Sequence, residues 1–109
     1  MLPMLMIKSD PKEQAVELDG LQPETVLAIL ITYLVFTNHG YEFCLTSVKD
    51  GVHGNKSLHR FGYAFDSQTH HIPLDTSKMI ETTVRQCLGR EYDVVLKETH
   101  LHVEFDPER

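Results

Sequence analysis

The sequence predicts a single α+β domain in which helices pack on one face of a small antiparallel sheet. Three observations support this fold class. The chain has 109 residues, too few for two domains of ordinary size. Hydrophobic residues make up 41% and charged residues 24%, as in soluble globular proteins. Helical and strand-like segments follow one another without the regular alternation that is typical of parallel α/β folds.

The first predicted helix runs from Pro23 to about Asn38. Proline is favoured at a first helical position, the acidic Glu24 suits the first turn, and Gly40 marks the end. The segment is apolar nearly all round, so we expect it to be the central, buried helix of the core.

The other elements follow from local composition. Met4 to Ile7 is a candidate edge strand, and residues 41–48, rich in aromatic and β-branched side chains, predict a second strand. Loops are expected at 49–55 and 67–73. A second helix is expected at about Lys78 to Leu88, with Asp75-Thr76-Ser77 as its N-cap and Gly89 as its end. Two strands, Tyr92–Lys97 and about His100–Phe105, complete the prediction.

Charge, cysteine content and hydropathy exclude several classes of protein. The net charge of −6 and the pI of about 5.5 argue against a general nucleic-acid binder. Cys44 and Cys87 form no disulfide framework and are expected to be buried free thiols. The longest apolar run, residues 26–36, is shorter than the roughly 20 residues that span a bilayer, so no membrane insertion is expected. The N-terminus lacks a secretory signal pattern, which predicts synthesis in the cytoplasm.

The last predicted strand separates apolar from ionisable residues. Side chains alternate between the two faces of a strand, so His100 and His102 share one face. The same alternation places Glu98 and Glu104 beside them, and the apolar residues on the opposite face. On spacing alone, such a row is explained equally well as a site and as a solvated polar face.

A second group of polar residues lies upstream. The sequence reads Ser57-x-His59-x-x-Gly62-x-Ala64-x-Asp66. His59 and Asp66 are seven residues apart and would face opposite ways on one continuous strand, so a turn or irregularity must intervene if both are to reach one centre. Alone, the pair is weak evidence for a site and is better explained as a surface histidine and a turn aspartate.

Together, the two motifs resemble the zinc site of the superfamily that contains D-Ala-D-Ala carboxypeptidases, phage peptidoglycan peptidases and the hedgehog signalling domain. The resemblance covers residues from about 45 to 107, and the segments Asp93–Leu96 and His102–Pro107 are similar to small phage or prophage members. It implies one zinc peptidase-like domain over residues 1–109.

The resemblance also assigns residues. It implies that His59, Asp66 and His102 bind a zinc ion and leave a fourth position open for water, as in catalytic zinc sites. His100 matches the second active-site histidine of the family. Relatives carry a glutamate three positions before the first histidine of the pair. Lys97 occupies that position here, so we expect Glu98, one residue later, to act as general base, with His100 as the alternative.

Two further residues are expected to contact substrate. Many relatives have an arginine shortly after a Thr-Ser strand end, where this chain has Lys49, which supplies charge without a bidentate fork. Ser57 could support the metal or the substrate by hydrogen bonding, or simply cap a turn. The pair His70-His71 is expected to lie in a solvated loop.

The implied function is zinc-dependent hydrolysis of peptidoglycan stem or cross-bridge peptides in a phage or prophage context. A virion partner, or release to the cell wall, would bring the protein to its substrate. One alternative is a non-catalytic zinc-binding interaction module of the same fold. Another is a non-haem Fe(II) oxygenase, which also uses two histidines and one carboxylate but normally needs a larger barrel.

Overall fold

The computed structural model describes residues 5–7, 22–49 and 64–107. Its elements follow in the order β1 (Leu5–Ile7), α1 (Pro23–Asn38), β2 (Phe43–Lys49), β3 (Ala64–Gln68), α2 (Leu74–Leu88), β4 (Tyr92–Leu96) and β5 (His100–Phe105). The strands form one sheet in the order β1-β2-β3-β5-β4. Strand β1 runs parallel to β2 at one edge, and every other neighbouring pair is antiparallel.

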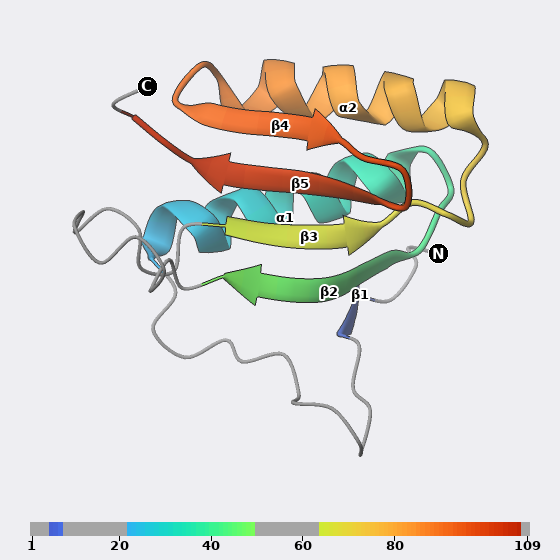
Figure 1. The fold of residues 1–109 in the computed structure, drawn as a ribbon, viewed down its shortest axis with the longest axis horizontal. Coiled ribbons are helices and arrows are strands. Elements are labelled where there is room, and N and C mark those ends of the chain that lie inside the picture. Colours follow the sequence, from blue (N-terminus) through green and yellow to red (C-terminus); the bar gives the residue numbers. More distant parts are fainter. Residues whose placement is uncertain (1–4, 8–21, 50–63, 108–109) are drawn as a thin grey trace.

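Both helices lie against the same face of the sheet, behind the strands in Figure 1. This arrangement confirms the predicted α+β class. The core lies between the two layers, where Phe36 of α1 packs against Phe43 of β2 with ring centroids 5.1 Å apart, and Phe43 in turn contacts Phe65 of β3. The opposite face of the sheet carries no helix of the described residues (Figure 1), which leaves room for a site.

Local sequence explains where α1 begins and ends. Pro23 opens it and Asn38 is its last residue, as predicted. Gly40 then adopts a φ of +84°, a conformation that L side chains rarely take, and its N–H donates to the carbonyl of Thr37. The hydroxyl of Tyr92 on β4 donates to the Glu24 carbonyl, which ties the start of the helix to the sheet.

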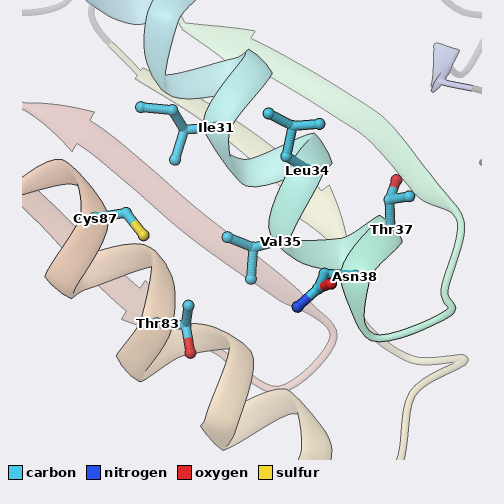
Figure 2. Close-up of a pocket in the computed structure, with 7 residues that line it drawn as sticks. All are labelled: Ile31, Leu34, Val35, Thr37, Asn38, Thr83 and Cys87. Atoms are coloured by element: carbon cyan, nitrogen blue, oxygen red, sulfur yellow. The ribbon is translucent and has the colours of Figure 1, made fainter.

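The prediction that α1 is buried on all sides is wrong. One face packs against the sheet, with Ala28 and Phe36 at 0–1% exposure, but Leu27, Leu30 and Leu34 are about half exposed. The described residues form only two layers, the sheet and the helices. A helix in such a fold has one layer to pack against, so its other side stays exposed. A groove of about 700 Å³ lies beside this exposed face, with Val35 of α1 and Cys87 of α2 pointing into it (Figure 2).

Three other expectations need correction. Helix α2 begins at Leu74, four residues before the predicted Lys78, because Pro73 already supplies the turn into the helix and Asp75 to Ser77 form its first turn. Cys87 is exposed and Cys44 half-buried, so neither is a fully buried thiol. Strand β3 occupies Ala64–Gln68, partly within a segment predicted as a loop.

Candidate metal centre

The uncovered face of the sheet holds a cluster of ionisable side chains at its centre. Asp66 of β3 stands directly opposite His102 of β5 in the strand register, and Gln68 stands opposite His100. Phe65, Leu101 and Val103 point to the helices and are buried, so alternation places Asp66, His100 and His102 on the open face. This placement agrees with the prediction that one face of β5 carries His100, His102 and Glu104.

Distances within the cluster are short. Asp66 Oδ1 lies 2.7 Å from His102 Nδ1 and 3.8 Å from His100 Nε2. On the other side of the ring, His102 Nε2 lies 3.1 Å from Glu104 Oε1. The side chains of Asp66 and His102 are only 11% and 13% exposed, whereas His100 is 31% exposed. The cluster therefore has a shielded centre and a solvent-facing rim.

Strand β2 contributes an irregularity beside this cluster. Leu45 pairs with Ser67, but the next pair is Ser47 with Asp66, so Thr46 is an extra residue in a β-bulge. The Thr46 hydroxyl donates to the Asp66 carbonyl over 3.3 Å. Beyond the bulge, Val48 pairs with the core residue Phe65. The bulge thus sets Ser47 next to Asp66.

Hydrogen bonds and burial act in opposite directions on His102. The hydrogen bond to Asp66 raises the pKa of this imidazole above its ordinary value of 6.5. Burial lowers the pKa, while the hydrogen bond to Glu104 adds to the rise, and the net shift is upward. An ionised carboxylate only accepts hydrogen bonds, so both contacts together require the doubly protonated ring.

Two side chains of the cluster, Asp66 and His102, are of the types that zinc commonly binds. Imidazole and carboxylate are ordinary zinc ligands, and bonds of about 2.0–2.2 Å at tetrahedral angles separate two ligand atoms by roughly 3.4 Å. His102 Nδ1 and Asp66 Oδ1 are closer than this, at 2.7 Å, the distance of a direct hydrogen bond. Within the described residues, no three His, Cys, Asp or Glu side chains are arranged to hold a metal by themselves. The predicted set takes its third ligand, His59, from outside those residues.

The other predicted site residues lie in different places. Ser57, like His59, lies outside the described residues. Lys49 ends β2 and pairs at the backbone with Ala64, the neighbour of Asp66 on the same face. Glu98 is exposed in the turn between β4 and β5, where the Lys97 N–H donates to the His100 carbonyl. Because β5 begins only at His100, strand alternation does not place Glu98 in the cluster.

His70 and His71 lie outside this cluster. Both are exposed in the connection between β3 and α2, as expected for a solvated loop. His71 Nε2 donates to the Glu42 carbonyl over 3.0 Å, and both rings line a cavity of about 230 Å³ with Gln68 and Cys44. Sequence reasoning missed Ser47 as a neighbour of Asp66, because the bulge has no clear signature in the residues 45–48.

Comparison with protein-family models, curated proteins and solved structures finds no match. In the described residues, neither helix is both long and apolar enough to cross a membrane.

Proposed function

We propose that the protein is a zinc-dependent peptidase that cleaves stem or cross-bridge peptides of peptidoglycan. One observation carries the metal-dependent part of this proposal: Asp66 and His102, two of the three predicted ligands, face each other across paired strands with donor atoms 2.7 Å apart. The substrate class rests on the sequence resemblance described above.

Asp66, His102 and His59 would hold the metal. When bound, zinc would polarise a peptide carbonyl and lower the pKa of water toward about 7. Asp66 supplies the negative charge that stabilises a cation at this shielded position. His102 would supply Nδ1, which lies 2.7 Å from Asp66 Oδ1.

His100 has the better position for proton transfer. Its Nε2 lies 3.8 Å from Asp66 Oδ1, at the solvent-facing rim of the cluster, and its Nδ1 lies 3.3 Å from the Thr99 hydroxyl. In the proposed reaction, Nε2 would exchange a proton with a peptide bound over the open face. Glu98, the general base expected from the sequence, would have to reach the cluster from the turn between β4 and β5.

Metal content and peptide cleavage, measured on the same variants, test the proposal. We expect His59→Ala, Asp66→Ala and His102→Ala each to lose stoichiometric zinc and to reduce muropeptide cleavage by at least about 100-fold, since even outer partners of ligands matter 10- to 100-fold. His70→Ala removes an exposed histidine outside the cluster and should change neither quantity. Full activity in all three ligand variants would refute the proposal.

A non-catalytic zinc-binding module is the second candidate. The exposed position of Glu98 outside the cluster favours it, because the module would need no general base. Stoichiometric zinc in the wild-type protein without hydrolysis of any cell-wall fragment would select this candidate over the peptidase.

A further inference from the structure

We propose that the outer side of the helical layer is an interface between two copies of this chain, in which α1 of one copy packs across the middle of α1 of the other. Both helices cover one face of the sheet (Figure 1), and strand alternation places Asp66 and His102 on the opposite face. Dimer formation therefore does not depend on the proposed metal centre.

The side of α1 that faces away from the sheet carries a leucine stripe. Leu27, Leu30 and Leu34 follow one another at intervals of three and four residues, so they lie along one side of the helix. All three are 50–55% exposed. An uncovered stripe of this kind is typical of contact surfaces, because a partner removes the apolar side chains from water. A partner on this side also explains why α1 is apolar nearly all round although the sheet covers only one side of it.

The same surface combines a ridge and a groove. The leucine stripe is the ridge, and the groove of about 700 Å³ runs beside it between α1 and α2 (Figure 2). Ile31 and Val35 line the groove on α1, and Cys87 lines it on α2. Helices pack when the ridge of one fits the groove of another. A symmetric pair needs a surface that complements itself, and this surface supplies both parts.

Charge favours a second copy over other partners. The chain has a net charge of −6, so copies repel one another wherever charged surfaces meet. Residues 25–38 contain no Asp, Glu, Lys or Arg. On α2, Glu81 and Arg85 are each two positions from Thr83, which turns them to the opposite side of the helix, where both contact β4. A symmetric contact sets a patch against itself, so an uncharged patch avoids this repulsion. A charged peptide or a nucleic acid would find no opposite charge here.

Sedimentation equilibrium of the wild-type protein tests whether the dimer forms. We expect the mass to rise from the 12.5 kDa of one chain toward twice that value as the protein concentration increases. A mass that stays at 12.5 kDa at every concentration would overturn the inference. That result would mean that the leucine stripe is covered by another segment of the same chain or contacts a different partner.

Opposite charges at one position test where the interface lies. Leu30 is at the middle of α1, close to the twofold axis of the proposed pair, so each copy presents it to the same residue of the other. Leu30→Glu and Leu30→Lys should each be monomeric, because two like charges would meet in an apolar contact. An equimolar mixture of the two variants should regain the dimer, because opposite charges then meet.

The matched control is Leu74→Glu. Leu74 is 63% exposed at the start of α2 and does not line the groove, so this variant should dimerise as the wild-type protein does. Urea unfolding in dilute solution, where the chains are separate, checks that the variants fold. If Leu30→Glu does not fold, Leu34→Glu in the same stripe replaces it.

The outcomes for the dimer and for the metal centre are separable. Zinc content should be the same in the wild-type protein and in the monomeric variants, because the helices and the ionisable cluster lie on opposite faces of the sheet. A dimer that persists in Leu30→Glu, or a mixture of the two Leu30 variants that stays monomeric, would overturn the proposed interface whatever the zinc content.

Discussion

His102 occupies an unusual position for a residue in the middle of a small sheet. Its ring touches carboxylates on two sides and is shielded from solvent. Without a metal, the ring compensates the negative charge of Asp66 and Glu104 only when it is protonated. A proton and a metal ion therefore compete for the same ring nitrogen. In the metal-free protein, binding of the proton should appear as a pH dependence of the free energy of unfolding.

We expect the metal-free protein to lose stability as the pH rises. The folded-state pKa of His102 lies above 6.5, so the folded chain holds this proton more tightly than the unfolded chain does. The stabilisation is fully present below pH 6.5 and is lost as the pH rises through the folded-state pKa. Urea unfolding with a chelator, at pH values on either side of that pKa, should show a smaller free energy of unfolding at the higher pH.

The variant His102→Asn serves as the control for this pH dependence. Because asparagine does not titrate, the decline in the free energy of unfolding with pH should be shallower than in the wild-type protein. An identical pH dependence in both proteins would show that His102 does not contribute.

Part of the cluster is predictable residue by residue. Alternation along β5 is enough to place His100, His102 and Glu104 on one face, and the structure confirms it. The failure at Glu98 has a simple cause, since alternation holds only inside a strand and the chain turns before His100. That Asp66 stands opposite His102 depends on strand register, which no local pattern in the sequence specifies.

At the scale of elements, α2 and β4 are joined by a small polar network. Glu81 Oε2 accepts hydrogen bonds from the Leu96 N–H at 2.9 Å and from Arg85 at 3.0 Å. Arg85 also donates to the Val94 carbonyl at 2.7 Å. Among the described strands, β4 lies at the edge of the sheet, so its outward backbone groups have no neighbouring strand there. The helix side chains supply partners for two of them.

Replacing Glu81 should therefore destabilise the fold. We expect Glu81→Ala to lower the free energy of unfolding by about 1–3 kcal/mol, because the Leu96 N–H loses its acceptor. Glu81→Gln keeps an acceptor oxygen and should lose less. Lys78→Ala, at an exposed position of the same helix, should stay within about 0.5 kcal/mol. Urea unfolding measures all three, and a wild-type midpoint for Glu81→Ala would contradict the role of this network.

Elements with strong local signals are predicted well from the sequence. Pro23 and Gly40 delimit α1, and the strands at 92–96 and 100–105 lie within about one residue of their predicted ends. Strand β3 was missed because its pattern is not apolar. Ser67 is fully buried on the core side, between the polar residues Asp66 and Gln68. The strand conformation of β3 comes from pairing with β2 and β5 rather than from the composition of the segment.

The described residues form a two-layer structure with both helices on one face of the sheet (Figure 1), and strand alternation places the cluster on the opposite face. Composition and element order were sufficient to predict this class. They were insufficient for the strand order, in which β5 lies between β3 and β4, because that order depends on long-range contacts. They also failed to predict that α1 has an exposed side.

A pair of substitutions in α1 tests this two-layer arrangement. Phe36 is fully buried against the sheet, so Phe36→Ala should lower the free energy of unfolding by about 3–5 kcal/mol. Leu30 is half exposed on the same helix, and Leu30→Ala should cost less than about 1 kcal/mol. Denaturant unfolding compares the two. Equal losses would mean that the far side of α1 is covered.

The bulge at Thr46 has a consequence for the tolerated length of β2. Leu45 and Val48 are three positions apart, and an unbroken strand would direct them to opposite faces. Because Thr46 is an extra residue in the bulge, both side chains nevertheless point to the core. Deleting Thr46 would restore an unbroken strand with the same inward set and would remove its hydroxyl bond to Asp66. Deleting a residue at Phe43–Leu45 would instead turn part of the core-facing side chains to the other face of the sheet. We therefore expect β2 to tolerate a deletion at its bulge and not before it.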